Sequence, residues 1–329
     1  MRVLYVLGNY PQLSESYIQA EIEFAIRSGV DVHVWSAACR HPFIQPPCPV
    51  YRGNLSEALI SAKPDLLHVH YLHEWRGRAS TLPRDLPATV RGHSFDWNPE
   101  TCTWVLKDSR VKKVYLFPHF AETVKDAKVV PLPVAFSSMR FQGSSEKDRR
   151  MVFRTGAGLP TKGLRDFFLA ATLCPDHRFV LAVAVAGGYE KFLEDLHAMN
   201  VESGMRVEIM IDVSWEEVAR LTAKAGIYMD TSDPAGHSFG MPISIAESMA
   251  TGSYVLAREA PGISGYLGEV GDIYTTYEQA AELVRETLSW DDQDWEATSI
   301  ATQKRSALFT DHAVLPRLLQ DWKVVAGRP

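Results

Sequence analysis

Cysteine is scarce in this sequence of 329 residues, and its spacing forms no binding motif. Disulfide frameworks and structural zinc sites need several cysteines at close, regular spacings such as Cys-x-x-Cys. No such spacing occurs here, so we expect neither a disulfide scaffold nor a cysteine-based zinc site. The four cysteines are Cys39, Cys48, Cys102 and Cys174.

Long apolar runs are also missing. The longest nearly apolar stretch, residues 179–188, has ten residues, whereas a membrane-spanning helix needs roughly 20. The opening residues, MRVLYVLGNYP, contain neither the apolar core nor the cleavage site of a secretory signal. We therefore expect a cytoplasmic protein without a membrane-spanning helix.

A strong excess of basic charge, typical of nucleic-acid-binding proteins, is absent as well. The formal net charge is −6, and we expect no nucleic-acid partner. The charge is uneven, because residues 1–150 hold 19 Lys/Arg against 15 Asp/Glu, whereas residues 151–329 hold 15 against 25. Either this is a solvated mixed surface, or the first half contacts an anionic acceptor or anionic lipid at the inner face of the membrane.

What is present is the pattern of a two-domain α/β protein. With 46% hydrophobic and 22% charged residues the chain is globular, and its length suits two domains. Apolar, strand-like runs alternate with amphipathic patterns, for instance RVLYVLGN at 2–9 and then SESYIQAEIEFAIRSG at 14–29. Such alternation predicts parallel sheets covered by helices on both faces.

The alternation is interrupted by the polar segment 137–150 and restarts with MVFRTGAG. We therefore predict an N-terminal Rossmann-like domain at 1–136, a linker at 137–150, a C-terminal Rossmann-like domain at 151–310, and a last helix at 311–329 that packs back on the first domain. Ligands of such doubly wound domains bind at the carboxyl ends of the strands. We expect the site in a cleft between two facing domains.

The stretch HSFGMPISIAESMATG, residues 237–252, carries the clearest chemical signal. Gly240 lets a ligand approach the backbone, and the helix start near Ile243 offers N–H groups and partial positive charge to a phosphate. Glu247 lies about one turn into that helix, where its carboxylate can accept hydrogen bonds from ribose hydroxyls. The alternative is an ordinary strand–turn–helix connection in which Glu247 is solvated.

This stretch, with the following residues 253–276, resembles the donor site of the retaining GT-B glycosyltransferases of family 4. MVFRTGAGLPTKGLRDFFLAA at 151–171 is similar to the Gly-Arg…Lys-Gly strand–loop–helix of that family. The opening, 5–36, resembles its exopolysaccharide members, and DLLHVHY at 65–71 and VRGHSFD at 90–96 resemble two of its acceptor-domain strand ends. The resemblance implies an α/β protein with the GT-B fold, two Rossmann-like doubly wound domains facing a cleft.

The resemblance also implies roles for single residues. Lys162 matches the lysine that binds the donor diphosphate, Glu247 the glutamate that holds the ribose, and His93 the acceptor-domain histidine near the reacting groups. These three are the candidate catalytic residues. The candidate donor-binding residues are Gly8, Arg154, Gly158, His237, Phe239, Gly240, Met241 and Ile243.

Two positions depart from the family pattern. The first glutamate of its Glu-x7-Glu motif is replaced by Phe239 or His237, depending on the register. Ala157 stands where the diphosphate-binding arginine is expected, and Arg154 is the nearest arginine that could take this role. We expect Asp233 or His237 to contact the donor sugar instead of the missing glutamate.

Other clusters in the sequence do not predict a cofactor. His68, His70 and His73 suggest a metal site, but no acidic or cysteine partner stands at ligand spacing, so we predict no metal. Trp97 and Trp104 flank what reads as a polar loop, where they could stack on an acceptor sugar or simply pack.

The predicted function is transfer of a hexosyl group from a nucleoside-diphosphate sugar to a hydroxyl acceptor, with retention at the anomeric carbon and without a metal. The acceptor would be a saccharide, a lipid-linked molecule or a small molecule, in polysaccharide biosynthesis. Three alternatives stay open: a GT-B nucleotide-sugar epimerase, an inverting transferase, and a non-catalytic nucleotide-sugar-binding protein. The last is favoured by the missing glutamate and arginine.

Overall fold

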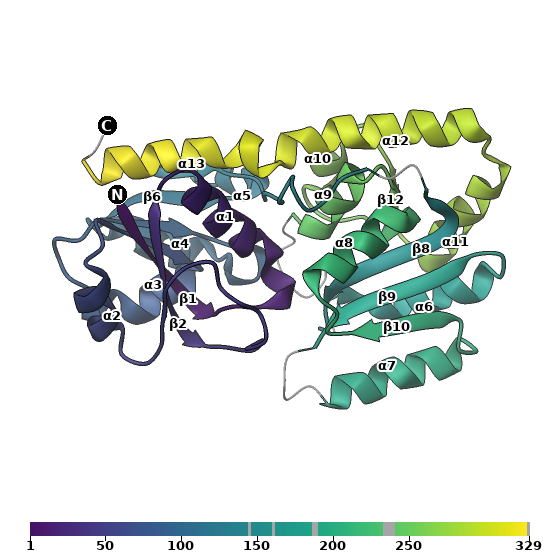
Figure 1. The fold of residues 1–329 in the computed structure, drawn as a ribbon. Coiled ribbons are helices and arrows are strands. Elements are labelled where there is room, and N and C mark those ends of the chain that lie inside the picture. Colours follow the sequence, from purple (N-terminus) through teal and green to yellow (C-terminus); the bar gives the residue numbers. More distant parts are fainter. Residues whose placement is uncertain (144–145, 160–161, 186–189, 233–240, 328–329) are drawn as a thin grey trace. The chain divides into compact units, whose positions relative to one another are not determined.

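A computed structural model describes the chain except for residues 144–145, 160–161, 186–189, 233–240 and 328–329. The chain divides into two compact units. Unit 1 consists of Met1–Ala135 and Asp311–Pro329, and unit 2 of Phe136–Thr310. The last helix of the chain therefore belongs to the same unit as the first strand (Figure 1).

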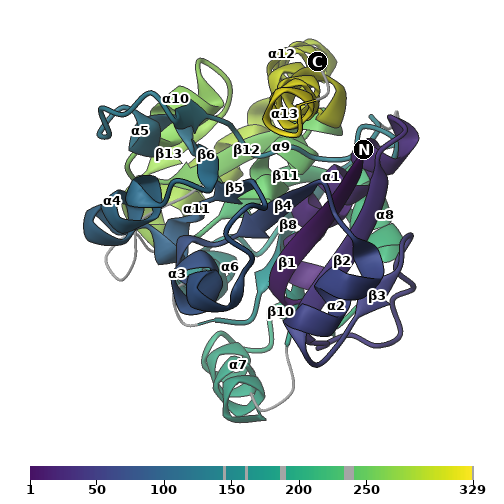
Figure 2. The same cartoon turned by 90° about the vertical axis from the view of Figure 1, so that its left-hand side faces the viewer.

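Unit 1 is built on a parallel sheet whose described strands follow the order β3-β2-β1-β4-β5-β6-β7. Its strands are β1 (Arg2–Asn9), β2 (Asp31–Ala38), β3 (Val50–Tyr51), β4 (Leu66–His70), β5 (Ala88–Arg91), β6 (Val111–Leu116) and β7 (Val129–Pro131). Figure 2 shows β1 between β2 and β4, its two parallel partners. The chain thus extends the sheet first to one side of β1 and then to the other, as in Rossmann-like domains.

Helices of unit 1 bury apolar faces against this sheet. They are α1 (Ser16–Arg27), α2 (Leu55–Ala62), α3 (Leu72–Arg78), α4 (Pro99–Lys107), α5 (Pro118–Ala121) and α13 (Asp311–Val325). Ile18 and Ile22 of α1, one turn apart, are fully buried. Trp322 of α13 is buried in the same hydrophobic core. The C-terminal helix therefore completes the core that the N-terminal segment begins.

Unit 2 repeats this topology with the strand order β10-β9-β8-β11-β12-β13, again parallel among the described residues. Its strands are β8 (Asp148–Ala157), β9 (Arg178–Ala184), β10 (Val207–Ile211), β11 (Ala225–Asp230), β12 (Tyr254–Arg258) and β13 (Asp272–Tyr274). Its helices are α6 (Leu164–Leu173), α7 (Glu190–Glu202), α8 (Trp215–Lys224), α9 (Ile243–Ala250), α10 (Ile263–Leu267), α11 (Tyr277–Glu286) and α12 (Asp292–Ser306). Because β8 begins at Asp148, the end of the segment 137–150 belongs to the sheet.

Two helix starts in unit 2 follow from local sequence. The side chain of Ser214 accepts a hydrogen bond from the backbone N–H of Glu217 at 3.2 Å, at the start of α8. Thr276 does the same for Gln279 at 3.3 Å, at the start of α11. Each cap satisfies an N–H group that has no partner within its helix. In the described part of the chain, no helix is both long and apolar enough to cross a membrane.

The segment between Trp97 and Trp104 is helical, so the polar loop that we expected there is wrong. Asn98 caps α4 by accepting the backbone N–H of Glu100 at 2.9 Å. Pro99 fills the first helical position, where a missing N–H removes no helical hydrogen bond. Trp104 is 41% exposed on this helix, and the Trp97 ring stacks on Phe120 at a centroid distance of 5.0 Å.

Candidate active site

Arg154 is the centre of a polar cluster at the carboxyl ends of β8 and β11 in unit 2. Its side chain is almost fully buried, and its Nη1 lies 3.2 Å from Oδ2 of Asp230. Nη1 also donates to the hydroxyl of Tyr228 at 2.9 Å. Nε and Nη2 lie 3.4 and 3.3 Å from the hydroxyls of Thr231 and Ser232. A buried guanidinium is therefore both neutralised and hydrogen-bonded, as its desolvation requires.

Lys162 is held beside this cluster. Thr231, which accepts from Arg154, donates its hydroxyl to the backbone carbonyl of Lys162 at 2.7 Å. The adjoining Gly163 has φ +56°, and a Cβ there would lie 2.1 Å from the carbonyl oxygen of Thr231, so only glycine allows this approach. Burial, and then the charge of Arg154, lower the pKa of Lys162, whereas Asp230 raises it. Two cations thus share one strand end.

The start of α9 is joined to the same cluster. The Tyr228 hydroxyl, which accepts from Arg154, donates to the side chain of Ser244 at 2.6 Å in the first turn of α9. Pro242 precedes the helix, and no side chain caps this start. The Tyr266 hydroxyl holds the Pro242 carbonyl at 2.9 Å. Hydrogen bonds therefore link a helix N-terminus, with its partial positive charge, to the two cations.

Glu247 lies one turn further along α9 and is 4% exposed. Burial is the largest cause of the raised pKa of Tyr266, and the charge of Glu247 raises this pKa further. The remaining donor-site candidates of unit 2 fall into two groups. Met241 and Ile243 immediately precede and begin α9. His237, Phe239 and Gly240, together with Asp233, lie outside the described residues.

Gly158 has a packing role. A Cβ at this position would lie 2.7 Å from Cε1 of Phe192 and 3.0 Å from Cγ1 of Val183. The structure therefore requires glycine there for close contact between β8 and the next strand–helix unit. This reason is independent of any ligand.

In unit 1, Gly8 and His93 lie toward the carboxyl ends of β1 and β5. A Cβ at Gly8 would meet Oε1 of Glu74 at 2.8 Å. The His93 ring is buried, with Nε2 lying 3.1 Å from Nδ1 of His70. The Asp96 carboxylate accepts the backbone N–H of His93 at 2.7 Å, within a capping box at the turn 94–96. His93 is thus tied into its own unit on both sides.

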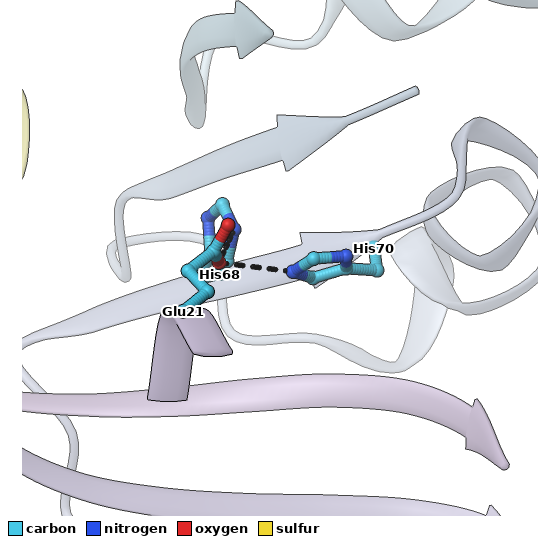
Figure 3. Close-up of side chains that lie close together, drawn as sticks. All are labelled: Glu21, His68 and His70. Atoms are coloured by element: carbon cyan, nitrogen blue, oxygen red, sulfur yellow. Dashed lines mark hydrogen bonds and ion pairs between the residues drawn. The ribbon is translucent and has the colours of Figure 1, made fainter. Parts of the chain in front are cut away.

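A buried ionic cluster in unit 1 was not visible in the sequence. Oε1 of Glu21 lies 3.0 Å from Nε2 of His68 and 3.1 Å from Nε2 of His70 (Figure 3). Its other oxygen accepts from Nη1 of Arg91. The expectation that no acidic group faces these histidines is therefore wrong. Burial favours a raised pKa for Glu21, but His70, Arg91 and His68 together hold it well below its usual value.

The amphipathic pattern of α1 was the available signal for this cluster. Glu21 stands three residues after Ile18 and next to Ile22, so it lies on the buried side of the helix. A charged residue on an apolar helix face needs a partner. His68 and His70 stand two residues apart in β4, so their side chains lie on the same face of the strand. The sequence does not show which strand α1 packs against. That packing is what brings Glu21 to His68 and His70.

Chemically, the unit 2 cluster is suited to a phosphorylated ligand. Arg154 is compensated by Asp230, so Lys162 provides the net positive charge of the cluster. The N-terminus of α9 adds backbone N–H groups. A partly desolvated lysine beside a helix N-terminus is an arrangement that stabilises a diphosphate and the charge it gains on leaving.

No protein-family model matches the chain, and no curated protein matches it either. Solved structures do. Sucrose-phosphate synthase from Thermosynechococcus elongatus superposes with a TM-score of 0.81 at 15% identity, covering 100% of both chains. Anabaena HepE in complex with UDP-glucose gives 0.80 at 16%, covering 98% of this chain and 100% of that one. A glycosyltransferase from Rickettsia africae gives 0.74 at 11%, covering 98% of each.

At these identities the likeness establishes the fold. The chain has the GT-B fold, two Rossmann-like doubly wound α/β domains, and this part of the sequence prediction is confirmed.

Proposed function

We propose that the protein is a glycosyltransferase that moves a hexosyl group from a nucleoside-diphosphate sugar to a hydroxyl acceptor, with retention at the anomeric carbon. One observation carries the proposal: Lys162, Arg154 and the start of α9 are joined by hydrogen bonds at the carboxyl ends of β8 and β11. Ligands of doubly wound domains bind at this edge. The structural neighbour HepE, solved with UDP-glucose, supports the donor class.

In the proposed reaction the bond between the anomeric carbon and the diphosphate oxygen breaks, and the electron pair goes to that oxygen. The acceptor oxygen forms the new bond on the same face, and its proton passes to the leaving diphosphate. Lys162 offsets the charge that develops there, and the N–H groups at the start of α9 do so as well. We propose that these groups serve in place of a metal ion.

Glu247 is the proposed ribose ligand, because its carboxylate lies one turn inside the helix whose start would hold the diphosphate. Met241 and Ile243 flank that start and would line the donor. On the acceptor side, we propose the strand end of unit 1 that carries His93, whereas Gly8 of the same unit is proposed for donor binding. The positive balance of the first half favours an anionic or lipid-linked acceptor over a neutral one.

Calorimetry with nucleoside diphosphates, paired with a sugar-release assay on nucleoside-diphosphate sugars, tests this function. Lys162→Ala should weaken diphosphate binding and slow transfer by about 2–4 kcal/mol in barrier, roughly 30- to 1,000-fold. Lys191→Ala is the matched control, because Lys191 is an exposed lysine of unit 2 that pairs with Asp195 on the surface of α7. Equal binding and rates in both variants would remove Lys162 from the site.

The non-catalytic alternative gives a different result in the same experiment. It is favoured by the Arg154–Asp230 ion pair, which leaves one fewer uncompensated cation for a leaving group. Wild-type protein that binds nucleoside diphosphates but releases no sugar, with or without a panel of hydroxyl acceptors, would support a binding protein over a transferase.

A further inference from the structure

A chain of hydrogen bonds runs through unit 1 from the His93 ring to Glu21. His93 Nε2 lies 3.1 Å from His70 Nδ1, and His70 Nε2 lies 3.1 Å from Oε1 of Glu21 (Figure 3). Both rings and the carboxylate are at most 4% exposed. Each link must therefore be satisfied inside the protein.

The protonation states of the two rings and the carboxylate determine which group donates in each hydrogen bond of this chain. Burial lowers the pKa of His70 to about 4 and that of His93 well below its usual value, so both rings are neutral near pH 7 with one N–H each. The ionised carboxylate of Glu21 can only accept, so the His70 proton is on Nε2 and is donated to Glu21. Nδ1 of His70 then carries a lone pair and accepts from Nε2 of His93, so the His93 proton is on Nε2.

We propose that Glu21 and His70 are positioning residues that hold His93 in its Nε2–H tautomer and so fix the segment 92–98 at the carboxyl end of β5. Nε2 of His93 then donates to His70, so this nitrogen cannot serve as a base toward a substrate. That this segment faces the acceptor rests on the proposed function; the hydrogen-bond chain does not.

The fixed segment is coupled to the neighbouring strand end. The Asp96 carboxylate accepts the backbone N–H groups of both His93 and Leu72. Tyr71, the residue before Leu72, has φ +77°, a conformation that non-glycine residues rarely adopt. Its ring lies 4.4 Å from that of His93. Holding His93 therefore also holds the strained end of β4.

A divalent metal is the competing explanation, because Glu21, His68 and His70 offer one ligand atom each within a small volume. The proton accounting argues against it, since Nε2 of His70 already carries the proton that Glu21 accepts. Arg91 already compensates the carboxylate from its other side. An ion would have to displace that proton and lie beside a buried guanidinium. The residues present fit a self-compensated cluster better than a metal centre.

Long-range ¹H–¹⁵N spectra of imidazoles in the full-length protein decide the tautomer directly, with His93 assigned by the signal lost in His93→Gln. We expect His93 protonated on Nε2 and His70 protonated on Nε2 at pH 7. Protonation of His93 on Nδ1 would overturn the proposal. This result does not depend on any substrate, so failure of the proposed function would leave it intact.

Two variants of His70 separate positioning from mere filling of space. In His70→Asn the side-chain oxygen takes the place of Nδ1 and can still accept from His93, whereas in His70→Gln the amide reaches toward Glu21 and that acceptor is lost. Hydrogen exchange of the His93 backbone amide, whose N–H the Asp96 carboxylate accepts, should stay near wild type in the first and become about tenfold faster in the second. Equal exchange in both variants would contradict the positioning role. If a variant fails to fold, the wild-type tautomer still decides.

Metal content and nucleotide binding complete the experiment. We expect less than a tenth of an equivalent of zinc, on the order of background, after dialysis against zinc chloride and then buffer. One tightly held zinc per chain, lost in His68→Ala, would overturn the proposal in favour of the metal. UDP affinity in the two His70 variants should match the wild type, because the proposed donor residues other than Gly8 lie in unit 2.

Discussion

Units 1 and 2 share one strand order but use buried charge differently. In unit 2, Arg154 and Asp230 meet at the carboxyl ends of the central strands, and Thr231 joins Arg154 to the backbone carbonyl of Lys162, for which the described residues show no ion pair. In unit 1, Glu21 on α1 is enclosed by Arg91 and two histidines from the strands. Buried charge alone therefore does not mark a ligand site. Under our proposal, the lysine and the helix N-terminus of unit 2 mark it.

The largest effect should come from breaking the unit 1 cluster. Glu21→Leu leaves the guanidinium of Arg91 buried without its carboxylate, which costs about 3–5 kcal/mol of unfolding free energy. Urea denaturation measures the loss, and Glu57→Leu, at an exposed position of α2 in the same unit, should change it by less than about 0.5 kcal/mol. A Glu21→Leu protein as stable as the control would mean that the cluster does not hold unit 1 together.

Acidification should weaken unit 1 through its histidines. The folded-state pKa of His70 is about 4, below the unfolded value of 6.5, so the unfolded chain binds more protons between these values. Stability is therefore present above pH 6.5 and is lost as the pH falls toward 4, by about 3 kcal/mol for this one ring. Glu15 opposes part of the loss, because burial raises its pKa to about 7 and its contribution declines as the pH rises from 4.5 to 7.

Chemical denaturation at pH 7, 5.5 and 4.5 measures this slope. Its assignment to the ring is tested in His70→Gln, which should lose less stability over the same interval than the wild type. Identical pH slopes in the two proteins would assign the acid sensitivity to other groups.

Glu247 should matter for binding in unit 2 and little for folding. We expect Glu247→Gln to raise the donor Michaelis constant by the loss of one charge-assisted hydrogen bond, about 1.5–3 kcal/mol. Glu247→Ala should have a larger effect. Titration of both variants with a nucleoside diphosphate and with the corresponding ribose-free diphosphate identifies the contact, since only the former should lose affinity. Equal losses for both ligands would contradict a ribose contact.

The substitution with the smallest expected effect tests most directly how the two units differ in their buried charges. Asp230→Asn removes the charge that compensates Arg154 but keeps an oxygen that can accept the N–H of Ser232, now 2.9 Å from Oδ1. Diphosphate binding should become about tenfold tighter, about 1.4 kcal/mol, at some loss of stability. Asp195→Asn, which frees exposed Lys191, is the control and should leave affinity unchanged. Weaker binding in Asp230→Asn would mean that the pair itself shapes the site.

The sequence predicted well the elements whose information is local. The alternation of apolar runs with amphipathic stretches predicted two parallel α/β sheets, and the resemblance of residues 151–171 and 237–276 to one family predicted the GT-B fold that the structural neighbours confirm. Ser214 and Thr276 cap helix starts through bonds between residues three apart, so such starts are indicated by local sequence.

Elements with weak local patterns were missed. The capping box of α12, in which Asp291 accepts the N–H of Asp294, went unrecognised, and only Trp295, Thr302 and Ser306 of that helix are buried. Its apolar pattern is too sparse to predict a helix. The sequence of α4 reads as a loop because its first turn is polar, although Asn98 is a strong cap.

The sequence by itself determined the order of strands and helices and the residue types available at each strand end. It did not determine which of them would meet. Glu21 and His70 are 49 residues apart, and Arg154 and Asp230 are 76 apart, so no spacing rule links either pair. Parallel sheets bring distant segments together at one edge, and a buried charge is stable only where the packed fold supplies its partner. Tertiary structure alone therefore decided that Arg154 is compensated by Asp230 and that the histidines of unit 1 face a carboxylate, and it underlies our proposal that Lys162 binds an anion.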